Sequence, residues 1–245
     1  MGKPSPPLDY MPRLSLGLGV QTIRKVGGGA DAGPSPSLLL HMNGSNGSTT
    51  FTDSSLNNFT MDVVSTTIST AVAKFGGASG YFSTEGYIYK DTSVDELKFS
   101  GDFCVEMWYY PLALDSNQCL YDASLIGQGG TRGDGWAIAI DDTGQMYWFH
   151  NGTANNTSAS PIANQWNFIA VTRSGSDLRV FLNGTEVLLL TNSVDFSRGG
   201  VIIGSINETI GAFSLDGYVD DVRVTKGIAR YTSNFTPPTA QFPNP

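Results

Sequence analysis

Large apolar side chains recur with a period of two along the middle of the chain. In the stretch 166–173 every second residue falls on one side, because successive side chains of a strand point to opposite faces. The residues on that side are Trp166, Phe168, Ala170 and Thr172. The stretch 102–110 carries large residues on both sides in the same way. This period predicts β-strands, not helices.

Two pairs of such stretches are joined by turn sequences. The stretch 177–183 is followed by a reversal at Asn183-Gly184. This pair supplies the positive φ angles of a type I′ turn and predicts a hairpin into 186–190. An Asp-Asp-Thr-Gly turn predicts a second hairpin, from 136–140 to 145–150. Antiparallel hairpins with aromatic side chains on both faces need a second sheet to pack against. The pattern therefore predicts a two-sheet antiparallel sandwich.

Shorter apolar stretches fill most of the remaining chain. The 29 glycines and 12 prolines suit many short strands joined by tight turns. One helical turn is predicted at 94–97, and no helix of ordinary length is expected. Further strands are predicted at 37–42, 81–82, 86–90, 118–121, 123–126, 200–204 and 217–225, and strands or strand-like loops at 60–64 and 70–75. The predicted fold class is all-β.

Residues 1–36 differ from the rest in their proline content and in a Gly-Gly-Gly run. Within them, four apolar residues alternate with serine and glycine: Leu14, Leu16, Leu18 and Val20. This alternation suits a strand that pairs with another body, and an unstructured tail explains the composition equally well. We therefore divide the chain into an extended N-terminal anchor arm, 1–36, and a sandwich, 37–245.

Charge and cysteine content narrow the function classes. A net charge of -8 leaves no basic stripe for nucleic acid, and no apolar run approaches the ~18 residues of a membrane helix. No secretory signal is recognisable at the start, so synthesis in a cytoplasm is expected. Cys104 and Cys119 are spaced for no zinc site, and a disulfide between them is less favoured than free buried thiols.

Six segments stand out when the chain is taken as a whole: LLLHMNG at 38–44, KFGGASG at 74–80, GDFCVEMW at 101–108, WNFIAVTR at 166–173, RVFLNG at 179–184 and GYVDDVRV at 217–224. Together, over about residues 37–243, they resemble the laminin G-like jelly roll of the concanavalin A-like lectin and glucanase superfamily. The closing TKGIARYTSNFTPP at 225–238 is similar to a variety common in bacteriophage structural proteins.

This resemblance implies a lectin-like adhesion domain of a virion fibre, spike or head appendage. It implies localisation on the phage particle, with the arm contacting other virion proteins and the sandwich contacting a host surface or glycan. A capsid or tail decoration protein that binds no glycan is the alternative, and a carbohydrate-active enzyme is the third. A homotrimer would suit a fibre, although no heptad repeat supports one.

Catalytic signatures are weak in the sequence. A retaining glucanase needs two carboxylates on one strand face about 5 to 5.5 Å apart, and Glu106 has no acid two residues away on either side. The adjacent pairs Asp141-Asp142 and Asp220-Asp221 are expected to point to opposite faces. Neither His41 nor His150 has an evident nucleophile or acid beside it, so both are expected to be structural. We therefore predict a protein that is not an enzyme.

Candidate binding residues lie around the second predicted hairpin. A stacking platform for sugar rings is predicted there, although core packing explains the same aromatics; its residues are Trp136, Tyr147, Trp148, Tyr109 and Tyr110, with Asp134 beside them. Asp134, Asp141 and Asp142 are the candidates for a calcium site, with plain solvated loop acids as the alternative. No other cofactor is expected. In the resembled family the acids at 216, 220 and 221 are structural and accept hydrogen bonds from neighbouring loops.

Overall fold

The computed structural model describes residues 33–124, 134–206 and 213–245. The four apolar residues of the predicted anchor, Leu14, Leu16, Leu18 and Val20, lie outside the described residues. In the described part, one 3-10 turn, η1 (Asp95–Leu97), matches the predicted helical turn. The strands are β1 (Leu38–Leu40), β2 (Asp62–Ser69), β3 (Ser79–Lys90), β4 (Phe103–Pro111), β5 (Gln118–Asp122), β6 (Trp136–Ile140), β7 (Met146–His150), β8 (Thr153–Asn156), β9 (Asn167–Ser174), β10 (Asp177–Leu182), β11 (Thr185–Thr191), β12 (Val201–Ile203) and β13 (Gly217–Lys226).

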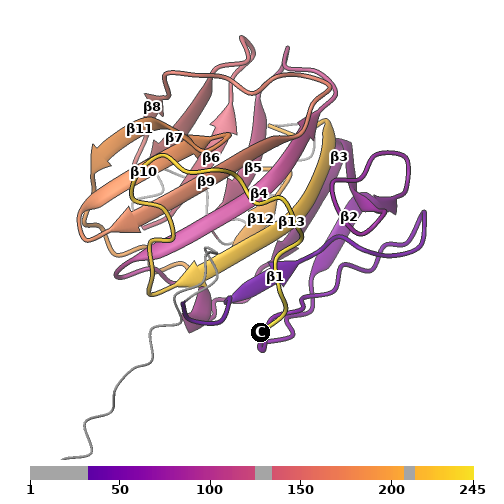
Figure 1. Cartoon of the computed structure of the whole chain (residues 1–245), viewed down its shortest axis with the longest axis horizontal. Coiled ribbons are helices and arrows are strands. Elements are labelled where there is room, and N and C mark those ends of the chain that lie inside the picture. Colours follow the sequence, from indigo (N-terminus) through magenta and orange to yellow (C-terminus); the bar gives the residue numbers. More distant parts are fainter. Residues whose placement is uncertain (1–32, 125–133, 207–212) are drawn as a thin grey trace, which may run out of the picture. The chain divides into compact units, whose positions relative to one another are not determined.

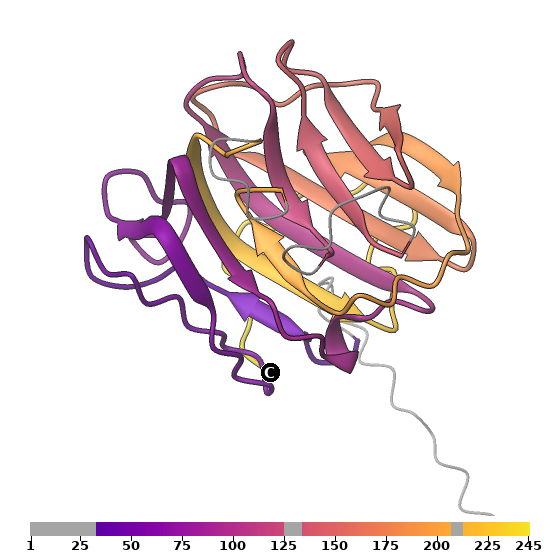
Figure 2. The ribbon, with the colours of Figure 1, turned by 180° about the vertical axis from the view of Figure 1, so that it is seen from behind.

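All strand pairs are antiparallel and form one ladder that folds into two layers. The order is β11-β10-β9-β4-β13-β3-β12-β5-β6-β7-β8, with β1 paired to β13 and β2 to β3. Figure 1 shows β10, β9, β4, β13 and β1 in the front layer, and Figure 2 shows the back layer that faces them. Two residues after the end of β8, the Ser158 amide donates to the Val187 carbonyl on β11 at 2.8 Å, so the two ends of the ladder nearly meet. The predicted two-sheet antiparallel sandwich is confirmed.

Both predicted hairpins are present. In the β10–β11 turn, Asn183 and Gly184 have φ angles of 51° and 80°, as a type I′ turn requires. In the β6–β7 turn, the Asp141 carboxylate accepts hydrogen bonds from the backbone amides of Thr143 and Gln145. Local turn chemistry therefore determines these two registers.

Of the two alternatives for 70–75, a strand or a strand-like loop, the structure has the loop. The amides of Lys74 and Phe75 donate to the side chain of Asp220, at 2.9 Å each, so they do not pair with a neighbouring strand. The predicted strands at 81–82 and 86–90 form one strand, β3, which pairs along its length with β2. Of the predicted strand at 123–126, Ala123 and Ser124 are not in a strand, and the remainder lies outside the described residues.

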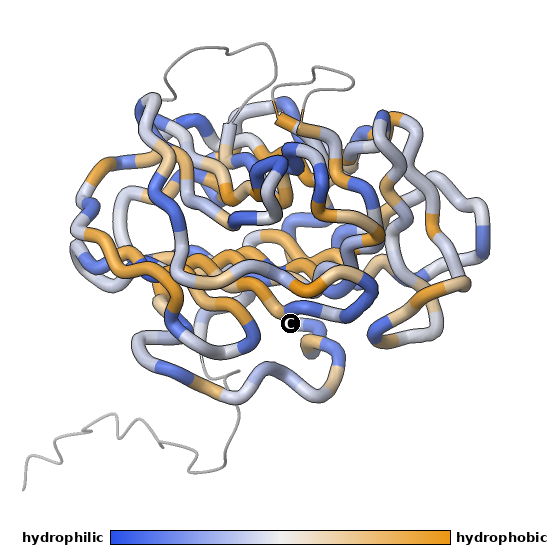
Figure 3. The backbone as a smooth tube through the Cα atoms, turned by 90° about the horizontal axis from the view of Figure 1, so that it is seen from above, coloured by the Kyte–Doolittle hydropathy of each residue, from blue (hydrophilic) through white to orange (hydrophobic). Residues whose placement is uncertain are grey.

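The front layer is buried on one face and covered over part of the other. One face packs on the back layer through the main core, and hydrophobic segments run through both layers in Figure 3. The opposite, outer face is covered by the C-terminal segment, residues 227–245, which crosses β10 and β9 in Figure 1. The outer-face cluster contains Leu39, Cys104, Trp108, Phe168, Ala170, Phe181, Tyr231 and Phe242. The side chains on the two faces of 166–173 thus pack against two different parts of the protein, the back layer and the C-terminal segment.

Cys104 and Cys119 are both free and buried, as favoured from the sequence. The Cys104 thiol lies in the outer-face cluster, where burial raises its pKa well above the ordinary value. Among the described residues, no helix is long and apolar enough to span a membrane.

Candidate functional site

The aromatic platform predicted around the β6–β7 hairpin is not on the surface. Trp136, Trp148 and Tyr147 have relative exposures of 0%, 2% and 8%. The Trp136 ring stacks on Tyr121 and Phe103 at centroid distances of 5.3 and 5.6 Å inside the main core. The prediction that these three rings contact sugar is therefore wrong, because the back layer turns both tryptophans toward the core and leaves little of Tyr147 exposed.

The acids proposed for calcium are engaged separately. Asp134 accepts a hydrogen bond from Arg198 at 2.5 Å, and Asp141 is committed to the β6–β7 turn. Asp142 is exposed. Within 33–124, 134–206 and 213–245, no three His, Cys, Asp or Glu side chains form a group able to hold a metal ion. The three acids are thus not brought together as one ligand group.

A row of four partly exposed aromatic side chains crosses the neighbouring strands β3, β13 and β4 and reaches the start of β9. Tyr218 of β13 is directly opposite Tyr81 of β3 on one side and Tyr110 of β4 on the other. Trp166 precedes β9 and lies next to Tyr110. Successive ring centroids are 5.1, 6.0 and 5.5 Å apart from Tyr81 through Tyr218 and Tyr110 to Trp166. We call these four residues the aromatic row.

Strand alternation places the aromatic row on the outer face. Phe82, Tyr109 and Val219 are the immediate chain neighbours of the three tyrosines, and all three belong to the main core. Because neighbouring side chains of a strand point to opposite faces, the tyrosines point away from that core. Trp166 packs at the edge of the outer-face cluster, which places it on the same face. The pairing of β13 with β3 and β4 then places Tyr218 beside Tyr81 and Tyr110, although the three are far apart in the sequence.

The row carries polar groups as well as ring faces. The Tyr218 side chain hydrogen-bonds with Ser69 of β2, and burial, with the neighbouring phenols of Tyr81 and Tyr110, raises the pKa of Tyr218. Its phenol is therefore protonated at neutral pH. A protonated phenol both donates and accepts hydrogen bonds. The row thus combines apolar faces with hydroxyl groups.

Exposed apolar residues and acids border one side of the row. Leu112 is 36% exposed, and its amide donates to the carbonyl of Asp216, the residue just before β13. Burial and the nearby carboxylate of Asp115 raise the pKa of Asp216. Ile162 is 54% exposed and is held by the Asn167 side chain, which both donates to and accepts from its backbone.

The other side of the row is bordered by the loop at 74–75. The Lys74 ammonium lies 3.7 Å from the ring centroid of Trp108, and Phe75 packs edge-on against the same ring. Both backbone amides of this loop are bound by Asp220, which is fully buried. Burial raises the pKa of Asp220 to about 7. This loop separates the aromatic row from the part of the face under the C-terminal segment.

Asp220 and Asp221 point to the same face, contrary to the prediction. A β-bulge interrupts the β13–β4 register here, and Asp221 has a φ of 50°. Asp221 accepts hydrogen bonds from the amide of Phe242 and from His41. Burial alone would lower the pKa of His41, but its hydrogen bonds with Asp221 and Asn244 raise it. His41 thus ties the C-terminal segment to β13, and it has an acid beside it that the sequence did not reveal.

Glu106 is buried in an ion pair. Its carboxylate accepts from Arg223 at 2.6 Å and from the Cys104 thiol at 3.1 Å, and it is 0% exposed. The Arg223 guanidinium lies over the ring of Phe242 at 3.7 Å. The C-terminal segment thus helps to bury the Glu106–Arg223 pair.

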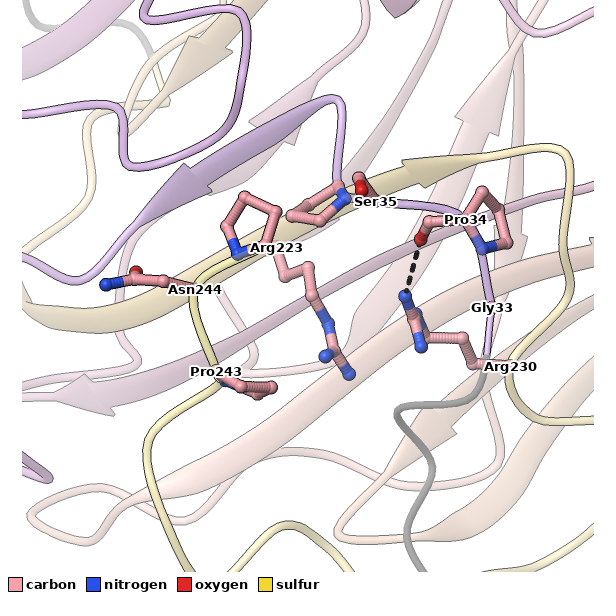
Figure 4. A pocket seen from close by; sticks show the side chains of 9 residues that line it. Gly33, Pro34, Ser35, Arg223, Arg230, Pro243 and Asn244 are labelled. Carbon is pink, nitrogen blue, oxygen red and sulfur yellow. Dashed lines mark hydrogen bonds between the residues drawn. The ribbon is translucent and has the colours of Figure 1, made fainter. Parts of the chain in front are cut away.

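Two small hollows lie near the ends of the C-terminal segment. One, of about 110 Å³, is shown in Figure 4; it is lined by four prolines and includes Arg223 and Arg230. The other, of about 180 Å³, is lined by His41, Met42 and three polar residues. Both are smaller than the ~300 Å³ at which ligand pockets usually begin. The open aromatic row is the better candidate for a binding surface.

Comparison with known proteins gives a family and several fold relatives. Residues 82–228 match the model of the Concanavalin A-like lectin/glucanases superfamily. No curated protein matches the chain. Domain 4 of AbnA, a GH43 extracellular arabinanase from Geobacillus stearothermophilus solved in complex with arabinotriose, is similar with a TM-score of 0.58 and 13% identity, over 80% of this chain and 95% of that chain.

The binding domains of two botulinum neurotoxins are similar to a comparable degree. For serotype D the TM-score is 0.57 with 15% identity, over 80% of this chain and 49% of that one. For serotype G the TM-score is 0.54 with 15% identity, over 82% and 48%. The chain therefore spans about half the length of these domains. Identities this low show a shared fold alone.

Sequence reasoning found one member of the row, Tyr110, and missed Tyr81, Trp166 and Tyr218. Tyr109, proposed with Tyr110, lies in the main core and is 0% exposed. A usable signal existed in the phase of each strand, since each missed tyrosine follows or precedes a core residue. The sequence pattern does not show which strands are neighbours. The row could therefore not be predicted from it.

Proposed function

The chain belongs to the concanavalin A-like lectin/glucanases superfamily, and from that premise we propose that it is a non-enzymatic module that binds glycans through the aromatic row. The observation that carries the proposal is the alignment of Tyr81, Tyr218, Tyr110 and Trp166 on one partly exposed face. Aromatic rings offer flat apolar faces to the C–H faces of sugars, and phenol groups hydrogen-bond their hydroxyls.

The fold relatives support this proposal. Domain 4 of AbnA was solved with arabinotriose, and it shares the fold over 95% of its own length. The burial of three acids of the described strands supports the non-enzymatic part. Glu106 is paired with Arg223, and Asp220 and Asp221 are buried with partners from loops. A glycosidase needs two carboxylates that reach substrate.

We further propose that this module works on the surface of a phage particle, attached to other virion proteins through residues 1–36. The support is the resemblance of 225–238 to phage structural proteins and the alternating apolar residues Leu14, Leu16, Leu18 and Val20. If a chain lacking 1–36 still enters particles, the anchor proposal fails. The homotrimer proposed for a fibre is tested by light scattering, which measures the oligomeric state of the full chain.

A decoration or cement protein is the second candidate function. The observation that favours it is the apolar border of the row, where Ile162 and Leu112 are 54% and 36% exposed. Such residues suit a contact with a neighbouring protein. Binding of the full chain to assembled particles, without binding to any glycan, would support this second candidate over the first.

The test is glycan binding by the full chain and by row variants. Removing one ring, as in Tyr218→Ala or Tyr110→Ala, is expected to weaken binding by about fivefold to tenfold, or ~1 kcal/mol per ring. Tyr89→Ala is the matched control, because Tyr89 is a partly exposed tyrosine of β3 outside the row. Equal losses in row and control variants, or no binding to a broad glycan array, would refute the proposal.

A further inference from the structure

The row also restricts the kind of glycan that fits it. We infer that its ligand is a single uncharged glycan chain of several sugar units, lying across the strands along the row. Flat crystalline polysaccharides and sialylated or sulfated glycans are excluded from this class. The inference rests on the proposed function and adds the ligand class to it.

The length of the row calls for a chain and not a single sugar. Three successive centroid distances of 5.1, 6.0 and 5.5 Å separate its four rings. Each distance is similar to the length that one sugar unit adds to a glycan chain. A chain that lies along the row therefore meets a new ring at about each unit. A monosaccharide contacts only a fraction of this surface.

The tilt of the rings excludes a flat ligand. The ring planes of Tyr81 and Tyr218 differ by 41°, those of Tyr218 and Tyr110 by 80°, and those of Tyr110 and Trp166 by 67°. Binding to a crystal face needs coplanar rings that contact parallel chains at once. A single soluble chain rotates about its linkages and presents faces in different directions. The row therefore suits a chain that turns along its length.

Charge around the row disfavours anionic sugars. Asp216 precedes Tyr218 by two residues, contributes to the raised pKa of that tyrosine, and has Asp115 nearby. An anionic glycan would face these carboxylates, and like charges across an interface cost binding energy. The net charge of the whole chain, -8, acts in the same direction.

Recognition of carboxylate or sulfate groups usually relies on arginine forks. Each arginine in the described part has contacts away from the row: Arg173 with the carbonyls of Phe99, Gly101 and Val194, Arg179 with Asp177 and Glu186, Arg198 with Asp134, Arg223 with Glu106, and Arg230 with Thr225. The cation that borders the row, Lys74, lies over Trp108, and burial lowers its pKa. The row thus has ring faces and hydroxyls but no fork for an anion.

The experiment compares three sets of probes on the full chain. Calorimetry uses neutral arabinan, xylan, mannan and mixed-linkage glucan oligosaccharides of increasing length, and sialyllactose, oligogalacturonates and heparin fragments as the charged set. Pull-down on microcrystalline cellulose and chitin tests the flat ligands. We expect at least one neutral series to bind with affinity that rises with length until the row is covered, several-fold weaker binding of the charged set, and no retention on crystals.

Tighter binding of charged probes than of every neutral series would overturn this inference and leave the proposed function intact. The same holds for retention on crystals that is lost in Tyr218→Ala. No binding to any probe would overturn the proposed function and the inference together. As a charge test, Asp216→Asn should raise the affinity for sialyllactose relative to a neutral oligosaccharide several-fold at low salt. Asp142→Asn, an exposed carboxylate of the β6–β7 turn, is the matched control and should not.

Discussion

Asp220 gives the sharpest test of the packing that borders the aromatic row. Its side chain is 0% exposed, and one carboxylate oxygen accepts the amides of both Lys74 and Phe75. Burial raises the pKa of this carboxyl from 3.8 to about 7. In the unfolded chain the same group titrates near its ordinary value. The substitution Asp220→Asn keeps an oxygen acceptor for the two amides and removes the titration.

The sign of the pH dependence follows from the proton balance. Between pH 4 and pH 7 the folded chain holds a proton on Asp220 that the unfolded chain has released. The contribution of Asp220 to stability is therefore full at and below about pH 4, falls as the pH rises, and is constant again above about pH 7. A rise of roughly three pKa units, at about 1.4 kcal/mol each, makes this contribution on the order of 4 kcal/mol.

Urea unfolding of the wild type and of Asp220→Asn at several values between pH 4 and pH 8 measures the effect. We expect the difference in unfolding free energy between the two proteins to shift steadily in favour of the variant as the pH rises to about 7. The difference reports Asp220 together with the small part of the His41 titration that depends on the charge of Asp220, because the remaining groups titrate in both proteins. Asp142→Asn, at an exposed position, should follow the wild type. A difference between wild type and Asp220→Asn that does not change with pH would refute the reasoning.

Three further perturbations test other parts of the fold. Arg223→Met leaves the buried Glu106 carboxylate without its cation and should destabilise the chain by about 3 to 5 kcal/mol in urea unfolding, whereas Arg223→Met with Glu106→Gln should recover part of the loss. Gly184→Ala should lower the free energy of unfolding by about 1 to 3 kcal/mol, since the φ of Gly184 is 80° and a Cβ would lie 2.0 Å from the Phe235 carbonyl oxygen. Gly175→Ala is the control and should lower it less, because Gly175 has a φ of 60° and open space around it. Equal losses of stability in the two variants would contradict this account. The Cys104 thiol should react with a thiol reagent only after unfolding, so labelling of the native protein at the rate of the unfolded chain would contradict its burial.

The outer face of the front layer has two distinct parts. Under the C-terminal segment, Tyr231 and Phe235 stack at 3.6 Å and pack edge-on against Phe168 and Phe181, which satisfies the apolar side of β9 and β10. Beyond the 74–75 loop, the aromatic row stays partly exposed. The same face therefore serves packing at one end and, in our proposal, glycan binding at the other.

Local sequence determined the strands and the hairpins of this protein. The Asn183-Gly184 turn and the alternation in 136–150 specify their conformations through contacts between residues close in the chain. The apolar pattern also placed large side chains on both faces of β4 and β9. These features depend on backbone conformation and on side-chain phase, and both can be read from neighbouring residues.

Tertiary structure alone decided which aromatic residues reach the surface. Trp136 and Trp148 were predicted to bind sugar, but both face the main core. Tyr81 and Tyr218 are 137 positions apart in the sequence, and their ring centroids lie 5.1 Å from each other. The bulge that turns Asp220 and Asp221 to one face, and the segment that covers Glu106, depend on strand order and on residues 227–245. Strand order arises from contacts between distant parts of the chain, and a period of two within each strand carries no information about which strands become neighbours.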